Sequence, residues 1–125
     1  ENAKKAIKRV GGGQRQLGIV AAGGLYALKN NIPRLSEDHA NAKLLCELLI
    51  NGGVCVEKVP NMTNMVFFSL TENCPSDEIF VNACSERGLL LNALSPRRIR
   101  LVTHLDVDRE DVERAASIIT EVISQ

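Results

Sequence analysis

The part of the chain that follows Ser36 constrains the fold most, because its hydrophobic spacing changes in turn between that of a helix and that of a strand. Apolar residues at i, i+3, i+4 and i+7 indicate an amphipathic helix, whereas strict alternation indicates a half-buried strand. Helices are predicted at 36–51, 76–87 and 108–123, and strands at 54–57, 65–70, 89–92 and 98–103. This order is typical of an α+β fold in which helices pack on one face of a small, mainly antiparallel sheet.

Local signals mark the starts of two of these helices. Ser36 is a favourable N-cap residue, and Glu37 and Asp38 suit the positive end of a helix dipole. Asp108 and Asp111 form a loose version of the capping box ahead of the last helix. We therefore expect helices to begin near residues 36 and 108.

Residues 1–10 predict a basic helix that has no N-terminal start signal. This segment carries Lys4, Lys5, Lys8 and Arg9. Because the sequence opens on Glu1 rather than on Met, we expect this chain to be the later part of a longer protein.

Residues 14–30 predict an apolar helix whose glycines need support from packing. Apolar residues recur there at helical spacing, together with Gly18, Gly23 and Gly24. Each glycine weakens an isolated helix by about 1 kcal/mol relative to Ala. We therefore expect close contact with another helix or with a sheet, and an interruption of the helix at Pro33.

Composition argues against several classes of function. The 15 basic and 15 acidic residues give a net charge of zero, whereas a protein that binds nucleic acid needs a basic excess to displace phosphate counterions. One Tyr and three Phe are too few to build a base-stacking platform. No apolar run approaches the ~20 residues that a membrane-spanning helix needs. We therefore expect neither a nucleic acid nor a membrane as a partner.

The cysteines predict free thiols rather than disulfides. Cys46, Cys55, Cys74 and Cys84 include no C-x-x-C pair. Cys46 and Cys84 fall on predicted helix faces, where a free cysteine acts as a small buried hydrophobic residue. Reduced thiols indicate a cytoplasmic protein, with the mitochondrion as the alternative compartment.

A glycine run at 11–13, followed by Arg15, is the first candidate site. It lacks the spacing of both a dinucleotide fingerprint and a P-loop. Backbone N–H groups at the start of a helix, together with a guanidinium, suit a phosphate or a carboxylate. The alternative is a flexible hinge between two helices, which residue chemistry alone favours.

Arg97, Arg98 and Arg100 form a second basic cluster. In a strand, Arg98 and Arg100 share one face, while Ile99 and Leu101 take the other. A guanidinium on a strand that borders a cleft is suited to bind a carboxylate through two parallel hydrogen bonds. The alternative is a solvated edge of the sheet, which residue chemistry alone somewhat favours.

Residues that bind metals or catalyse reactions form no recognisable set. His39 and His104 lack partners at metal-ligand spacing, so no metal site is predicted. The acidic residues at 106–111 are better explained as caps of the last helix than as a calcium loop. By residue chemistry alone, the chain is an anion-binding half-site without catalytic residues.

Three stretches of the chain stand out when they are taken together. They are KRVGGGQRQ at 8–16 with AAGGLYAL at 21–28, RLSEDHANAK at 34–43 and RIRLVTHLDV at 98–107. In sequence and in order, these stretches resemble the L-threonine aldolases, and they extend over nearly the whole chain. Gln14 is one departure from the family pattern, in which Met is common at this position.

The resemblance implies an aspartate-aminotransferase-like fold, called fold type I, with pyridoxal 5'-phosphate as cofactor. It implies a carbon–carbon lyase that cleaves L-threonine or L-allo-threonine to glycine and acetaldehyde by retro-aldol chemistry. By the same resemblance, Arg100 would bind the α-carboxylate of the amino acid substrate. Arg15 would approach the cofactor phosphate from a neighbouring subunit, and Lys8 would lie near that site. The complete enzyme would be a homo-oligomer, a dimer or a tetramer.

The resemblance also implies which parts lie outside this chain. The family's lysine that binds the cofactor covalently belongs upstream, so the chain alone is expected to be inactive. Residues 1–35 would be the end of the large cofactor-binding domain with a linking helix, and 36–125 the C-terminal small domain. Two alternatives stay open: a non-catalytic anion-binding or assembly module, and the small domain of another fold-type I lyase such as a β-eliminating lyase.

Overall fold

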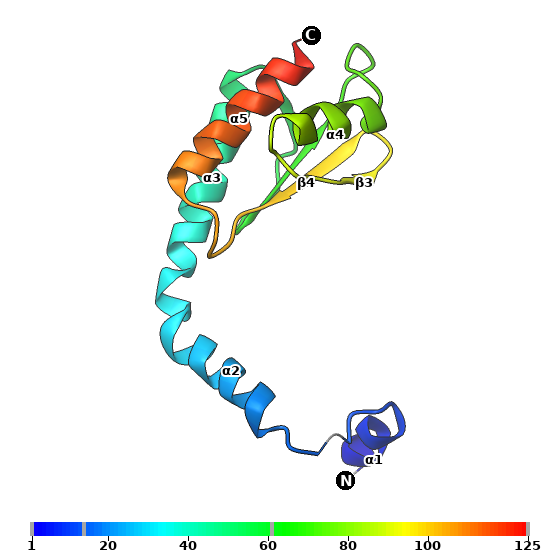
Figure 1. Cartoon of the computed structure of the whole chain (residues 1–125), viewed down its shortest axis with the longest axis vertical. Coiled ribbons are helices and arrows are strands. Elements are labelled where there is room, and N and C mark those ends of the chain that lie inside the picture. Colours follow the sequence, from blue (N-terminus) through cyan, green and yellow to red (C-terminus); the bar gives the residue numbers. More distant parts are fainter. Residues whose placement is uncertain (1, 14, 61, 125) are drawn as a thin grey trace. The chain divides into compact units, whose positions relative to one another are not determined.

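The chain divides into two compact units in the computed structural model, Glu1–Arg34 and Leu35–Gln125 (Figure 1). The structure describes residues 2–13, 15–60 and 62–124. Gln14, where the sequence departs from the family pattern, lies outside the described residues. The boundary between the units falls within one residue of the predicted boundary, while the assignment of the first unit to a larger domain stays a prediction.

The first unit consists of helices with no buried residue. Helix α1 (Asn2–Arg9) is followed by α2 (Gly18–Asn30) and by the short 3₁₀ helix η1 (Ile32–Arg34), and no side chain of the three is buried. The interruption expected at Pro33 is confirmed, because α2 ends at Asn30 and η1 takes its place.

Close packing at the glycines of α2 is not found within the described residues of the first unit. A Cβ atom built on Gly18, Gly23 or Gly24 would meet no atom within 4 Å. Within the first unit, no described element packs on these glycines, so the expected contact with a helix or a sheet stays a prediction.

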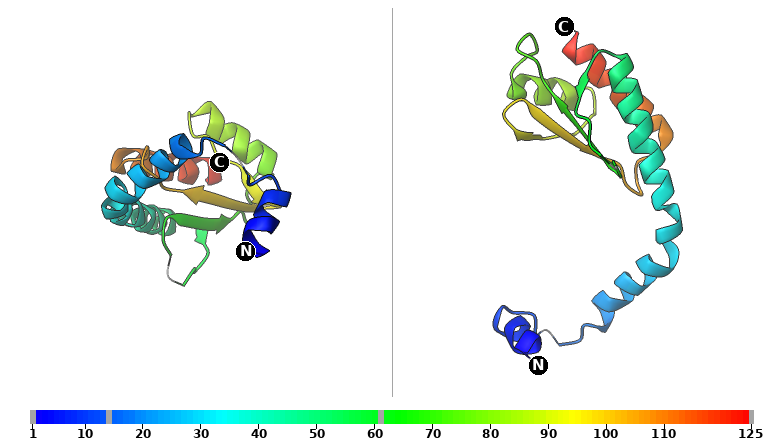
Figure 2. Two further views of the ribbon diagram at one scale, coloured as in Figure 1. Left: turned by 90° about the horizontal axis from the view of Figure 1, so that it is seen from below. Right: turned by 180° about the vertical axis from the view of Figure 1, so that it is seen from behind.

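The second unit contains the remaining elements and has the predicted α+β architecture. They are α3 (Leu35–Asn51), β1 (Cys55–Val56), β2 (Met65–Ser69), α4 (Asp77–Glu86), β3 (Ala93–Ser95), β4 (Arg98–Val102) and α5 (Arg109–Ile123). The strands form one antiparallel sheet in the order β1-β2-β4-β3. Seen from behind, this sheet lies in front of α4 (Figure 2).

One face of the sheet and the three helices close a continuous core. Val66 and Phe68 from β2 and Ile99 from β4 are almost fully buried against apolar residues of α3, α4 and α5. The rings of Phe68 and Phe80 meet edge to face, with centroids 6.0 Å apart. Helices on one face of the sheet are therefore confirmed, and so is the buried position of Cys84.

Helix starts agree with the predictions in one of two cases. At α5 the capping box is confirmed, because Asp108 accepts from the Asp111 amide at 2.9 Å and Asp111 accepts from the Asp108 amide at 3.3 Å. At α3 the predicted N-cap is wrong. The helix begins at Leu35, directly after η1, so Ser36 lies inside its first turn.

The strand predicted at 89–92 is also displaced. Gly88 has a positive φ of 83°, and Leu89 and Leu91 then pack against the core instead of joining the sheet. Pairing with β4 starts only where Ala93 lies opposite Ile99. An apolar run without alternation fits both arrangements, and packing against the helices selects the irregular one.

The four cysteines form no disulfide. Cys46, Cys55, Cys74 and Cys84 are all free, as predicted. Burial raises the pKa of the Cys84 thiol to about 11, although Arg87 partly opposes the shift. Burial, followed by the charge of Glu47, also raises the pKa of Cys46. Among the helices of the described residues, none is both long and apolar enough to cross a membrane.

Candidate functional site

Three arginines at the start of β4 have different surroundings, and Arg97 has a structural role. Its backbone amide donates to both carboxylate oxygens of Asp77, at 3.0 and 2.9 Å. Its guanidinium donates to the carbonyl oxygens of Leu70, Thr71 and Cys74. Arg97 has a positive φ of 57°, a backbone conformation that non-glycine residues rarely adopt, and these hydrogen bonds stabilise it. Arg97 therefore joins the β3–β4 turn to the segment after β2.

Arg98 is bound to Glu57 across the sheet. Its Nε and one terminal nitrogen donate to the two carboxylate oxygens of Glu57 at 2.7 and 2.8 Å, and its guanidinium lies 4.9 Å from the centre of the Phe67 ring. This hydrogen bonding lowers the pKa of Glu57 and raises that of Arg98. Arg98 is therefore occupied by a protein carboxylate.

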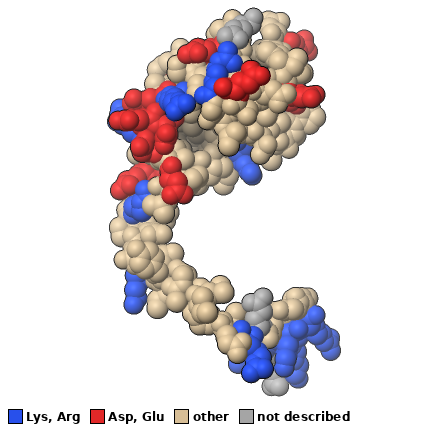
Figure 3. All heavy atoms as spheres, viewed as in Figure 1, with Lys and Arg blue, Asp and Glu red and all other residues tan. Residues whose placement is uncertain are grey.

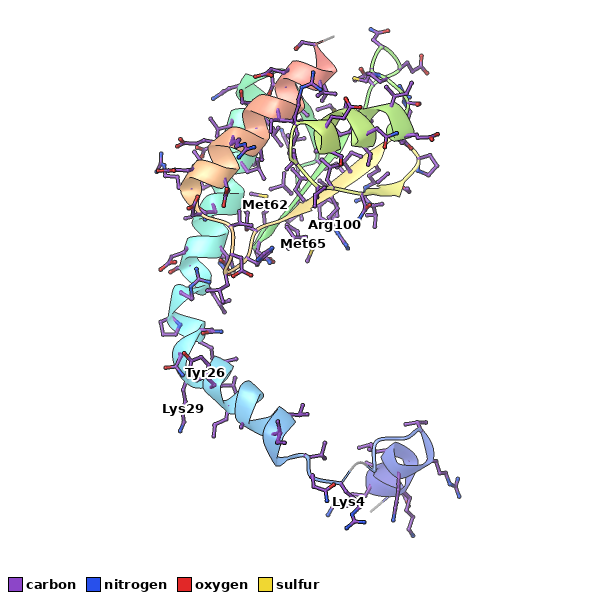
Figure 4. The ribbon with its side chains drawn as sticks, viewed as in Figure 1. Lys4, Tyr26, Lys29, Met62, Met65 and Arg100 are labelled. Carbon is purple, nitrogen blue, oxygen red and sulfur yellow. The ribbon has the colours of Figure 1, made fainter. Side chains whose placement is uncertain are left out.

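Arg100 has no such partner among the described residues. Arg98 and Arg100 share the face of β4 opposite to the buried Ile99, as alternation predicted, and Arg100 is exposed. Its guanidinium forms no ion pair or hydrogen bond with residues 2–13, 15–60 or 62–124. Figure 4 shows Arg100 on the side of the sheet away from α4. Of the three arginines, Arg100 alone is available to an external anion.

A hollow of about 480 Å³ in the second unit reaches Arg100. Apolar residues from α5, β4 and the segment before β3 line much of it, and they include Leu89, Leu91, Leu101, Val112 and Ala115. Arg100, His104, Asp111 and Arg114 contribute polar groups. An apolar hollow with a few polar groups has the character of a site for a small ligand.

Hydrogen bonds at the end of β4 fix the strand that carries Arg100. Thr103 is 2% exposed, and its hydroxyl donates to the backbone oxygen of Asp38 in α3 at 2.7 Å. The Thr103 amide donates to the Asn64 oxygen at 2.9 Å, and the Asn64 side-chain amide donates to the Thr103 oxygen at 3.0 Å. This network ties β4 to both α3 and the residue before β2. Sequence reasoning missed it, because its members are 39 and 65 positions apart.

The glycine run of the first unit ends α1 rather than forming an open anion cradle. The Gly12 amide donates to the Ile7 oxygen at 2.8 Å, and Gly11 has a positive φ of 86°. A Cβ on Gly12 would lie 2.3 Å from a methyl carbon of Ile7, so only glycine fits there. Helix α2 begins only at Gly18. The idea that these amides open a helix towards a ligand is therefore wrong.

The other two predicted site residues are both exposed side chains of the first unit. Lys8 lies in the last turn of α1, and Arg15 lies between the glycine run and α2. Arg100 belongs to the second unit. Within the described residues, no group of three His, Cys, Asp or Glu side chains could hold a metal ion. The Nδ1 atom of His104 instead accepts from the Asp106 amide at 3.3 Å.

Comparison with known proteins supports the resemblance to threonine aldolases. The low specificity L-threonine aldolase of Escherichia coli K12 is 47% identical over 118 residues, which cover 91% of this chain and 33% of that protein. The low-specificity L-threonine aldolase 1 of Arabidopsis thaliana is 37% identical over 119 residues, covering 94% of this chain and 33% of that protein. The chain thus spans about a third of the length of these relatives.

The chain also resembles a solved structure and matches a family model. A mutant of M. tuberculosis Rv3290C superimposes with a TM-score of 0.56 at 16% identity, covering 86% of this chain and 23% of that one, which is a likeness of fold. Residues 1–73 match the model of the beta-eliminating lyase family, and this match extends over more than half of the 125 residues. The chain belongs to the beta-eliminating lyase family.

Proposed function

We propose that this chain is part of a pyridoxal-phosphate-dependent carbon–carbon lyase that cleaves L-threonine or L-allo-threonine to glycine and acetaldehyde. Family membership and two relatives named L-threonine aldolase support this reaction. The observation that carries the chain's own role is the availability of Arg100 beside two arginines that are bound to protein groups.

Arg100 binds the α-carboxylate of the substrate in this proposal. The planar guanidinium offers two parallel N–H donors to a carboxylate, so it fixes both the position and the orientation of the amino acid. Orientation matters because the bond that breaks must be aligned with the cofactor ring. Pyridoxal phosphate, when bound, supplies the electron sink for the pair left on Cα. Arg100 also borders the hollow, whose lining is largely apolar.

Exposed cations of the first unit fit the phosphate group of such a cofactor. Arg15 and Lys8 both present their side chains to solvent. A phosphate dianion is matched by a guanidinium fork and by an ammonium group. We assign Arg15 to the phosphate of a neighbouring subunit in a homodimer or homotetramer, with Lys8 close to the same site. The Gly12 amide takes no part, because it is bound to Ile7.

In this proposal, the rest of the protein supplies the groups that complete the active site. The lysine that holds the cofactor lies outside this chain, residues 1–35 end the large domain, and 36–125 form the small domain. The chain alone is then inactive. When it is mixed with pyridoxal phosphate and reduced with borohydride, it should gain no stoichiometric covalent adduct. Such an adduct on one lysine would contradict the proposal.

Substitution of Arg100 in the full-length protein tests the central assignment. Loss of two charge-assisted hydrogen bonds should raise KM for L-threonine by about 10- to 100-fold in Arg100→Ala. The absorbance of the bound cofactor should remain. Arg114→Ala is the matched control, since Arg114 lines the same hollow from α5 and should change KM less than about twofold. Loss of the cofactor in Arg100→Ala would show that the role of this residue is assigned wrongly.

The name of the matched family supports a second candidate, a lyase that eliminates a group from Cβ of an amino acid. The carboxylate role of Arg100 is the same in both reactions. Products separate them: retro-aldol cleavage releases glycine and an aldehyde, whereas elimination releases ammonia and a keto acid. Full-length protein that forms no glycine from L-threonine would favour the second candidate.

A further inference from the structure

Glu57, Phe67 and Arg100 occupy one row across the exposed face of the sheet. Phe67 lies directly opposite Arg100 in the β2–β4 register, and the Glu57 amide donates to the Phe67 oxygen at 2.8 Å. Val56, next to Glu57, lies opposite the buried Phe68 and packs against the core. Directly opposed residues point to the same face of a sheet. Glu57 therefore faces the same side as Arg100, with the Phe67 ring between them.

Arg98 reaches Glu57 from the neighbouring row. Arg98 lies opposite Ser69, and Ser69 lies opposite Cys55, so Arg98 is two residues along the strand from Glu57's row. Its side chain crosses Phe67 diagonally to make both hydrogen bonds with the Glu57 carboxylate.

The backbone of Arg100 lies closer to that of Glu57 than the backbone of Arg98 does. Strands lie about 4.8 Å apart and rise about 3.4 Å per residue, so Arg100 is about 10 Å from Glu57 along the row, and Arg98 about 12 Å along the diagonal. Because the Arg98 side chain spans the longer distance to Glu57, the Arg100 side chain is long enough to span the shorter one. Glu57 is thus a protein carboxylate within the range of Arg100, and Arg98 engages both of its oxygens.

We propose that Arg98 is a positioning residue. Its bidentate hydrogen bonds hold the Glu57 carboxylate and so keep the Arg100 guanidinium available for the carboxylate of the substrate. This inference rests on the proposed function of Arg100. Without Arg98, the Glu57 carboxylate competes with substrate from the same sheet face, at the high effective concentration of a tethered group. The competition lowers affinity for the amino acid, while the chemical step after binding keeps its rate.

Three variants of the full-length holoenzyme separate this role from a purely structural one. Arg98→Met keeps an unbranched apolar chain over Phe67 and removes the charge. We expect it to weaken glycine binding about tenfold by isothermal titration calorimetry, and to raise KM more than it lowers kcat. Adding Glu57→Gln should restore glycine affinity to within about threefold of wild type, because the amide has no negative charge. Glu57→Gln alone should bind glycine within about twofold of wild type.

The structure of the variant gives a readout that does not depend on activity. In crystals of Arg98→Met grown without amino acid, the Arg100 guanidinium should lie within hydrogen-bonding distance of Glu57. Arg98→Lys is the second arm, and it remains informative if Arg98→Met does not fold. A lysine makes a single point contact, so we expect a smaller loss of affinity that Glu57→Gln again reverses.

Two results would overturn the inference. A double variant that binds glycine as weakly as the Arg98 variant would mean that Arg98 acts through packing on Phe67. Arg98 variants with unchanged glycine affinity would mean that Glu57 does not compete for Arg100. The Arg100→Ala variant distinguishes failure of the positioning role of Arg98 from failure of the proposed function. If Arg100→Ala binds glycine normally, the assignment of Arg100 to the substrate carboxylate is itself wrong. If Arg100→Ala weakens glycine binding while the Arg98 variants do not, only the positioning role is lost.

Discussion

The two units of the chain use apolar residues in opposite ways. The second unit closes a core that includes Phe68, Phe80 and Ile99 at 0% exposure. Helix α2 of the first unit carries a single charged residue, Lys29, yet Ile19 is 84% exposed and no residue of the helix is buried. Figure 3 shows this helix as an almost uncharged surface, whereas basic side chains gather on α1.

The difference shows where each unit obtains its stability. A helix that is apolar on all sides is stable when other elements surround it. An isolated helix of 13 residues is only marginally stable in water, and the glycines of α2 weaken it further. The second unit instead has strands and helices that cover one another. Since the chain spans about a third of its relatives' length, we expect protein outside this chain to cover α2.

Hydrogen exchange should separate the two units most widely. In the 125-residue chain, the Ile99 amide of β4 should exchange at least about a thousandfold more slowly than the Tyr26 amide of α2. The Ile99 amide exchanges only when the core unfolds, whereas the Tyr26 amide exchanges whenever α2 frays locally. Exchange followed by NMR gives both rates in one sample. Equal protection of the two amides would mean that α2 is stable without cover.

Core substitution should give the next largest effect. Phe80→Ala removes a ring that is 0% exposed and packed on Phe68, so it should lower the free energy of unfolding by about 3–5 kcal/mol. Ile19→Ala, in α2, should change it by less than about 0.5 kcal/mol in this chain. Urea unfolding followed by far-UV circular dichroism measures both. Similar losses for the two variants would remove the distinction between the units.

Sequence reasoning predicted some features of the second unit correctly and missed others. The alternation of Arg98, Ile99 and Arg100 and the capping box at Asp108 were predictable, because both depend on neighbouring residues. The displaced β3 was not, since the leucines at 89–91 have no period that selects a strand. The Glu57–Arg98 bond depends on strand register between residues 41 positions apart. The resemblance pointed to Arg100, but only the structure shows that Arg97 and Arg98 are hydrogen-bonded to protein groups.

Alkaline pH should weaken the second unit through its buried thiol. Burial raises the pKa of Cys84 from 9.0 to about 11, so the unfolded chain loses this proton near pH 9 while the folded chain keeps it. The free energy of unfolding should therefore fall as pH rises from about 9 to about 11, by at most about 3 kcal/mol. Cys46, whose pKa is also raised, contributes in the same direction. Urea unfolding across this pH range measures the slope.

Cys84→Ala provides the control for the alkaline effect. It leaves no thiol at this position to ionise, so the decline above pH 9 should become shallower even though the smaller side chain lowers stability at every pH. A slope that is identical in wild type and variant would show that other groups cause the alkaline loss.

Helix capping should give the smallest effect and the most direct contrast between the units. The α5 helix begins with the reciprocal bonds of Asp108 and Asp111, whereas α2 begins after Leu17, which makes no side-chain cap. Asp108→Ala should lower the free energy of unfolding of the second unit by about 1 kcal/mol, because one backbone donor loses its partner. Leu17→Asp should add a comparable stabilisation to α2 alone and raise its helical content, since a carboxylate at that end also favours the helix dipole. Urea unfolding measures the first change, and NMR chemical shifts of α2 measure the second. If Leu17→Asp instead raises the unfolding free energy of the second unit, then the two units unfold together and their stabilities are not independent.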